Sequence, residues 1–149
     1  GGSEGPGLHS APGIAIYIRD RAADVTGAPQ NGAFNHVRRG APRCRGMRPE
    51  QRVQAIADTP DYGHIVCRCE TVTEAEVIDA LRGPLHIRDM DSIKRRTRTM
   101  GGRCQGGFCS MRLPEIISNE LNIPITEVTK AGPGTNLLLG RDKADLADL

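Results

Sequence analysis

Short stretches of apolar residues at helical spacing, separated by glycine and proline, run along this 149-residue chain. An apolar residue at every third or fourth position predicts an amphipathic helix, whereas strict alternation of apolar and polar residues predicts a strand. On this pattern we expect a mainly α-helical protein, with an extended segment over residues 62–69 and no convincing sheet. The expected helices cover residues 13–24, 48–58, 73–82, 92–99 and 110–121.

Local signals mark the first residues of three of these helices. Thr73 and Glu76 have the spacing of a capping box, in which each side chain binds a free backbone N–H of the first turn. Asp91 and Ser110 are expected to cap the two helices that follow, because their short side chains carry an oxygen acceptor. The sequence therefore predicts three capped helices in the second half of the chain.

Residues 26–61 have a different pattern, with much glycine and proline and little periodicity before residue 48. Such a stretch is typical of an extended linker. Its one helix, over residues 48–58, is expected to turn Val53 and Ile56 inward. We expect four parts in order: a first segment (1–25), the linker (26–61), a small domain of short helices (62–140) and a charged tail (141–149).

The composition offers little material for a hydrophobic core, with no Trp, two Phe, two Tyr, 18 Gly and 10 Pro. A domain this poor in aromatic residues gains stability from a bound metal. The formal net charge of +2 gives no overall field for binding nucleic acid. No apolar run approaches the roughly 20 residues of a membrane span, and no signal peptide is visible. We therefore expect a cytoplasmic protein whose cysteines are reduced.

Four of the five cysteines lie in two short motifs, C-x-C over residues 67–69 and C-x₄-C over residues 104–109. We call these motifs the first clip and the second clip. Alternate residues of an extended segment point to the same side, so the first clip could hold one metal. Glycines precede and interrupt the second clip, and they allow backbone amides to approach inorganic sulfide closely. The pattern predicts a metal site and, more specifically, an iron–sulfur cluster.

The surroundings of both clips favour a negatively charged cluster. Each clip comes just before the N-terminus of an expected helix, where free amides and the helix dipole favour negative charge. Arg68 and Arg103 stand beside cysteines. We expect these cations to favour the reduced, more negative cluster and to raise its reduction potential.

Other interpretations of the cysteines remain open from the residues alone. A structural zinc site in an interaction module could use the same four thiolates, although neither clip has the usual C-x₂-C spacing. Two disulfides would require an oxidising compartment. Cys44 lies in the linker and is expected to be a bystander thiol, and His64 is expected to pack or face solvent.

No other motif predicts chemistry. The basic run over residues 93–98 is expected to be a solvated helix face, because no stacking aromatic residues accompany it. No pair of carboxylates and no Ser/His/Asp set is visible. We therefore expect no catalytic residue in this chain.

Three segments together resemble a known family: residues 64–70, with Cys-Arg-Cys-Glu; residues 96–98, Arg-Thr-Arg; and residues 100–109, Met-Gly-Gly-Arg-Cys-Gln-Gly-Gly-Phe-Cys. They resemble the BFD-like 2Fe–2S domain of the bacterioferritin-associated-ferredoxin type, over about residues 62–140. The Cys-Gln-Gly of the second clip is similar to the version at the C-terminus of flavoprotein dehydrogenases. The resemblance implies a few short helices around a 2Fe–2S cluster. Its implied ligands are Cys67, Cys69, Cys104 and Cys109.

Residues 7–15, Gly-Leu-His-Ser-Ala-Pro-Gly-Ile-Ala, resemble the closing segment of an FAD-binding oxidoreductase domain. The order of this segment, linker and cluster domain is similar to that of anaerobic-type FAD-dependent glycerol-3-phosphate dehydrogenases. The resemblance implies electron transfer from FAD in the parent chain to an acceptor subunit or a quinone-linked carrier. The same cluster domain in an amine- or amino-acid-oxidising flavoprotein is the alternative.

The chain lacks the G-x-G-x-x-G fingerprint of a dinucleotide-binding fold. It also begins with Gly1-Gly2 rather than Met. We therefore expect a C-terminal fragment that binds no FAD by itself. We expect it in the cytoplasm, where partner subunits could hold it at the inner membrane.

Overall fold

The computed structural model describes residues 7–35, 37, 40–140 and 142. The chain forms two compact units, Gly1–Arg39 and Gly40–Leu149. The later half of the expected linker thus belongs to the second unit. The expected charged tail over residues 141–149 lies outside the described residues, apart from Asp142.

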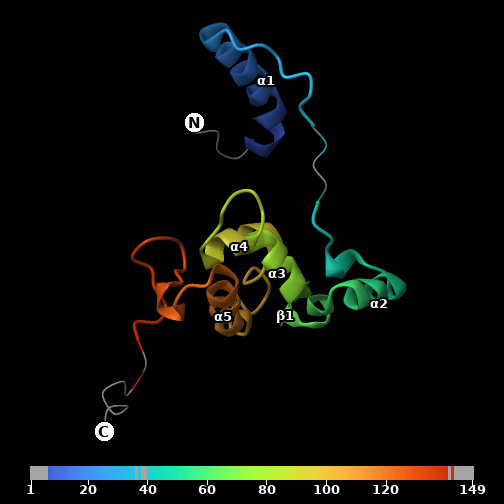
Figure 1. The fold of residues 1–149 in the computed structure, drawn as a ribbon, viewed down its shortest axis with the longest axis vertical. Coiled ribbons are helices and arrows are strands. Elements are labelled where there is room, and N and C mark those ends of the chain that lie inside the picture. The colour runs from blue at the N-terminus through green and yellow to red at the C-terminus, as the bar shows by residue number, and fades with distance from the viewer. Residues whose placement is uncertain (1–6, 36, 38–39, 141, 143–149) are drawn as a thin grey trace. The chain divides into compact units, whose positions relative to one another are not determined.

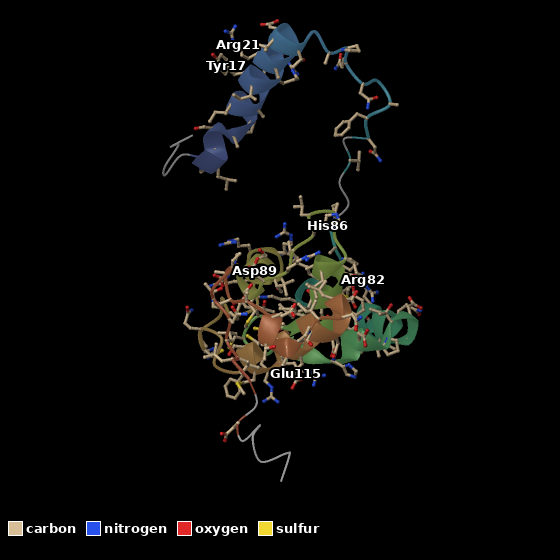
Figure 2. All side chains as sticks on the ribbon, turned by 60° about the vertical axis from the view of Figure 1, so that its left-hand side comes forward. Tyr17, Arg21, Arg82, His86, Asp89 and Glu115 are labelled. Atoms are coloured by element: carbon tan, nitrogen blue, oxygen red, sulfur yellow. The ribbon has the colours of Figure 1, made fainter. Side chains whose placement is uncertain are left out.

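The first unit contains one long helix, α1 (Gly7–Thr26), followed by irregular chain (Figure 1). The helix begins six residues before the predicted residue 13 and continues through Pro12. None of its residues is buried, and Figure 2 shows Tyr17 and Arg21 projecting from it. Apolar side chains such as Ile16 and Ile18 are exposed. Packing within this unit therefore does not explain why α1 is apolar.

The second unit is built on three helices, α3 (Glu74–Leu81), α4 (Met90–Thr97) and α5 (Cys109–Leu121). Figure 1 shows α3, α4 and α5 gathered together, and their inward side chains form a single core. The expectation of a mainly α-helical domain of short helices is confirmed. The fully buried apolar side chains include Val77, Met90, Ile93, Leu113, Ile117 and Val128.

A small antiparallel sheet also exists, contrary to the sequence prediction. Strand β1 (Ile65–Cys67) pairs with β2 (Val72–Thr73), in a register that places Cys67 opposite Val72. Strands of three and two residues are too short to show alternation, so the pattern could not reveal them. The hairpin between them carries the end of the first clip.

The predicted helix caps are partly correct. The capping box of α3 is confirmed, because the Thr73 amide donates to Glu76 Oε2 at 2.9 Å and the Thr73 hydroxyl accepts from the Glu76 amide. The prediction of Asp91 as the α4 cap is wrong. Asp89 takes this role, since its Oδ1 accepts from the Ser92 amide at 2.8 Å. Asp91 instead forms an ion pair with Lys130. The two residues are 39 positions apart, so the sequence alone does not reveal this pair.

The prediction that Ser110 caps α5 is wrong. The N-cap is Phe108, which makes no capping bond through its side chain, and the Ser110 hydroxyl donates to the Gly106 carbonyl at 2.5 Å. The preceding loop comes close enough to offer this carbonyl as an acceptor. Ser110 therefore ties the start of α5 back onto the second clip.

Helix α2 (Pro49–Asp58) lies between two 3₁₀ turns, η1 (Cys44–Gly46) and η2 (Pro60–Gly63). The prediction that Val53 and Ile56 point inward is wrong, because their exposed fractions are 69% and 42%. No residue of α2 is buried. The helix packs mainly against the short turn η2, which is too small to cover its apolar face.

The segment after α5 contains the turn η3 (Ile125–Glu127) and then runs beside the start of α4. The Met90 amide donates to the Thr129 carbonyl at 3.1 Å, and the Asp91 amide donates to the Lys130 carbonyl at 2.9 Å. Among the described residues, no helix is both long and apolar enough to cross a membrane.

Candidate metal centre

The first clip is delivered by the hairpin that joins β1 to β2. Cys67 is the last residue of β1 and is buried, whereas Cys69 lies in the turn and is half-buried. Thr71 closes the turn with a left-handed backbone, φ 52°. The sheet thus fixes one cysteine of the clip firmly and leaves the other nearer the surface.

The second clip lies in a tightly wound loop over residues 98–109, which we call the glycine loop. Its backbone is left-handed at Arg98, Met100, Gln105 and Gly106, with φ values of 70°, 61°, 50° and 93°. Outside glycine this conformation costs roughly 1–2 kcal/mol per residue, so other interactions must hold it. Turn hydrogen bonds contribute, including one of 3.0 Å from the Gly107 amide to the Cys104 carbonyl.

The two clips bring their thiols together in pairs. The Cys104 thiol is hydrogen-bonded to the Cys69 thiol, and the Cys109 thiol is hydrogen-bonded to the Cys67 thiol. Each pair joins one cysteine from each clip. The four cysteines expected from the sequence thus face one another across the junction of the hairpin and the glycine loop.

Gly102 permits this close approach of the two clips. A Cβ atom at Gly102 would lie 2.4 Å from Cys69 Cβ, a distance at which something must move. Any larger residue would therefore push the first clip away from the glycine loop. Gly106 is similarly constrained, since its φ of 93° favours glycine and an added Cβ would lie 3.3 Å from Met100 Cγ.

The pKa values of two thiols are shifted in opposite directions. The hydrogen bond from the Cys69 thiol lowers the pKa of Cys104, and the backbone amides of Gly106, Phe108 and Gly107 lower it further. Burial raises the pKa of Cys109 to about 11, with Cys67 adding to the effect. A buried thiol resists ionisation until a cation compensates its charge, as metal binding does.

The four thiols have the donor chemistry of a 2Fe–2S cluster site. Within the described ranges, no group of three or more His, Cys, Asp or Glu side chains is arranged to hold one metal ion. A 2Fe–2S cluster takes four thiolates shared between two irons. The paired thiols and the inward-facing amides of the glycine loop match that requirement.

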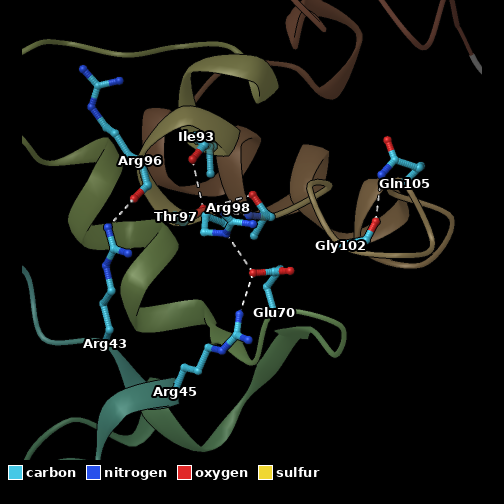
Figure 3. A network of polar contacts seen from close by, with 10 residues as sticks. Arg43, Arg45, Glu70, Ile93, Arg96, Thr97, Arg98, Gly102 and Gln105 are labelled. Atoms are coloured by element: carbon cyan, nitrogen blue, oxygen red, sulfur yellow. Dashed lines mark hydrogen bonds and ion pairs between the residues drawn. The ribbon is translucent and has the colours of Figure 1, made fainter. Parts of the chain in front are cut away.

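Charged side chains lie beside the first clip, and Figure 3 shows a network of polar contacts that includes Glu70, Arg45 and Arg98. Glu70 follows Cys69 directly and forms ion pairs with Arg45 and Arg98. Arg98 is the larger cause of a lowered pKa at Glu70, and Arg45 adds to it. Glu70 lies within a sequence motif of the first clip, but the motif predicts no role for it. Arg68 and Arg103 are exposed, as cations flanking a centre can be.

The remaining candidates stand apart from the four paired thiols. His64 Nδ1 lies 3.4 Å from Glu74 Oε2 and 3.8 Å from Asp61 Oδ1, so it belongs to a group of polar side chains at the surface. Cys44 is buried in η1. In the basic run of α4, Arg96 donates to the Ser92 carbonyl of its own helix at 3.2 Å.

Comparison with known proteins shows what this centre is similar to. Residues 65–119 match the family described as BFD-like [2Fe-2S] binding domain. That description names an iron–sulfur cluster, and the zinc alternative finds no support. No solved structure matches the chain.

Curated relatives extend the similarity beyond the matched domain. The glycerol 3-phosphate dehydrogenase of Caloramator mitchellensis is 36% identical over 146 residues, covering 97% of this chain and 30% of the relative. The anaerobic glycerol-3-phosphate dehydrogenase subunit A1 of Haloferax volcanii is 37% identical over 79 residues, covering 50% of the chain and 13% of the relative. The hydrogen cyanide synthase subunit HcnB of Pseudomonas aeruginosa is 36% identical over 85 residues, covering 54% and 17%.

The chain therefore spans less than a third of the length of each of these relatives. Both clips lie inside the matched region, and so do the sheet, α3, α4 and most of α5. The candidate centre is therefore similar, over residues 65–119, to the BFD-like [2Fe-2S] binding domains.

Proposed function

We propose that residues 62–140 form an electron-transfer domain in which four cysteines hold a 2Fe–2S cluster. The proposed ligands are Cys67, Cys69, Cys104 and Cys109. The observation that carries this proposal is the facing of the two clips, which pairs Cys104 with Cys69 and Cys109 with Cys67. Bound there, a 2Fe–2S cluster supplies a store for one electron at a time.

The chain's own residues prepare the site in three ways. The amides of Gly106, Gly107 and Phe108 face the Cys104 sulfur and can stabilise negative charge on it. Buried apolar side chains such as Val66 and Met100 exclude water from one side. The missing side chain of Gly102 lets the two clips close together.

We further propose that the parent protein is an FAD-dependent dehydrogenase acting on glycerol 3-phosphate. The support is the relative of that name, whose similarity covers 97% of this chain, including α1 and the linker. Electrons would then pass from flavin in the FAD-binding part of the parent to an acceptor subunit or a quinone-linked carrier. We place this parent in the cytoplasm, held at the inner membrane by partner subunits.

A different flavoprotein parent is the second candidate. Two relatives named hydrogen cyanide synthase subunit HcnB favour it, with similarity covering 54% and 38% of the chain. This coverage is smaller than that of the glycerol 3-phosphate dehydrogenase, so we favour the latter. Adding glycerol 3-phosphate to the complete parent enzyme tests the choice, because only the favoured parent would reduce its cluster.

Metal analysis of the chain purified without oxygen tests the domain's function directly. We expect equal amounts of iron and acid-labile sulfide, two of each per chain, and visible absorption that fades on reduction with dithionite. The reduced protein should give the electron paramagnetic resonance signal of one unpaired electron. A colourless protein containing zinc would contradict the proposal.

A further inference from the structure

Glu70 has an unusual position for an acidic residue, because it stands between a cysteine and two arginines. Its side chain is only 11% exposed. One oxygen, Oε2, accepts from Arg45 Nη1 at 2.8 Å and from Arg98 Nε at 2.9 Å. Figure 3 shows the carboxylate between these two guanidinium groups. A carboxylate with so little solvent access is stabilised by such cationic partners.

The two arginines belong to segments far from Glu70 in the sequence. Arg45 lies in η1, before α2, and Arg98 is the left-handed residue that ends α4 and opens the glycine loop. Glu70 itself belongs to the hairpin of the first clip. A single carboxylate thus joins the first clip, the glycine loop and the segment that leads into the domain.

Two further contacts lie at the same junction. A Cβ atom at Gly102 would lie 3.3 Å from Glu70 Oε1, so the carboxylate also borders the glycine loop at its closest approach. Arg43 Nη2 donates to the Arg96 carbonyl at 3.3 Å, which is a second link between the segment before α2 and the end of α4 (Figure 3). The segment is therefore fastened at two points, by Arg45 to Glu70 in the hairpin of the first clip and by Arg43 to the end of α4.

We propose that Glu70 is a positioning residue that holds the glycine loop and residues 43–46 against the first clip. In this role it fixes the spacing of the two clips and sets part of the charge beside the cluster. Its pairing with Arg98 holds a left-handed backbone that a residue other than glycine adopts only at a cost. The inference rests on the proposed function, because it assumes that the clips hold a cluster.

Reduction potentials of the full chain, loaded with its cluster, provide the first test. The substitution Glu70→Gln keeps the shape of the side chain and removes one negative charge, so the potential should rise. Arg98→Gln and Arg45→Gln each remove a positive charge, so the potential should fall. General loosening of the domain would shift all three potentials in one direction, and that result would overturn the electrostatic part of the proposal.

Proteolysis of the loaded chain provides the second test. With Glu70→Ala, trypsin should cleave after Arg43 and Arg45 several-fold faster, as followed by mass spectrometry, because the segment is no longer held. The control is Glu120→Ala, which breaks a comparable ion pair. Glu120 is 19% exposed and binds Arg82 at 2.5 and 2.9 Å, joining α3 to α5.

The rate of iron release to a chelator completes the experiment. Both Glu70 variants should lose iron several-fold faster than wild type, whereas Glu120→Ala should not. If Glu70→Gln and Glu70→Ala matched Glu120→Ala in potential, cleavage and iron release, the proposed role of Glu70 would be refuted. Absence of iron and sulfide from the wild-type chain would instead refute the proposed function, so the two failures are distinguishable.

Discussion

The glycine loop and helix α5 follow one another in the chain, yet different forces hold them in shape. Helix α5 buries Leu113, Ile116 and Ile117 in the core, where their transfer from water stabilises the fold. The glycine loop buries little apolar surface apart from Met100 and Cys109 and has four left-handed residues. The helix can hold its shape by packing, whereas the loop depends on hydrogen bonds, Glu70 and the proposed cluster.

Loss of one proposed ligand should give the largest difference in order between the glycine loop and α5. With Cys104→Ser we expect loss of the visible absorption of the cluster and loss of amide protection in the glycine loop. Helix α5 should stay partly ordered, because its core contacts do not involve Cys104. Hydrogen exchange read by mass spectrometry would measure both regions in one experiment. The matched control is Cys44→Ser, which should leave the absorption unchanged. Equal exchange in the loop and in α5 of Cys104→Ser would contradict the comparison.

Gly102→Ala should have the next largest effect, again centred on the loop. The new methyl group would lie 2.4 Å from Cys69 Cβ, so the clips must separate and the cluster content should fall to a small fraction of wild type. Gly46→Ala is the control, because nothing lies within 4 Å of an added Cβ there. Iron and sulfide analysis of both variants decides the point. A wild-type content of iron and sulfide in Gly102→Ala would show that the two clips can bind a cluster at a larger separation.

Leu113→Ala should weaken the helix side of the comparison. Leu113 is fully buried, and truncation of such a leucine costs about 2–5 kcal/mol of the free energy of unfolding. Met111→Ala on the same helix should cost little, because Met111 is 77% exposed. Urea unfolding would measure both changes. The Leu113→Ala chain should still bind its cluster at low urea, and failure to do so would couple the core to the centre more tightly than the contacts indicate.

The ion pair between Asp91 and Lys130 gives a smaller effect with a defined pH dependence. Lys130 lowers the pKa of Asp91, so the pair stabilises the fold above the unfolded-state pKa of about 3.9. This stability is lost as the pH falls through the lowered folded-state value. The difference in unfolding free energy between wild type and Asp91→Asn should be constant from pH 8 to pH 5 and should narrow below about pH 4. A difference that changes between pH 8 and pH 5 would exclude this explanation.

Arg68→Gln should give the smallest effect. The side chain is exposed beside the first clip, so solvent screens its charge. We expect a small fall in reduction potential, less than the fall for Arg98→Gln, whose charge lies beside a largely buried carboxylate. Protein-film voltammetry of the two variants gives the ranking. A larger fall for Arg68→Gln would mean that Arg68 is closer to the cluster than Arg98.

Features set by neighbouring residues could be predicted from the sequence, and features set by distant contacts could not. The capping box of Thr73 and Glu76 involves one turn of chain and was predicted correctly. Which of Asp89 and Asp91 caps α4 depends on a distant residue. Lys130, 39 residues from Asp91, binds the Asp91 carboxylate, and Asp89 is the cap. The helical spacing of Val53 predicts that its side chain points inward. Spacing alone does not show whether another element covers that face of the helix.

The candidate centre shows the same limit. Two cysteine motifs and a glycine-rich loop are local signals, so the four thiols could be named before the structure. The role of Glu70 could not be predicted in this way, because its two arginine partners lie 25 and 28 residues away in the sequence. An acidic residue next to a cysteine is not by itself part of a recognised motif. The local sequence does not single it out either, because Arg68 is the one arginine nearby and Glu74 and Glu76 follow within six residues.

The contact at Gly102 also bears on how this sequence can change over evolutionary time. One added carbon atom there already overlaps Cys69, and a proposed ligand cannot be exchanged to make room. No single compensating substitution is therefore within reach, and lineages that keep the centre should retain this glycine. Gly46 and Gly40, where an added Cβ meets nothing within 4 Å, should vary freely between lineages.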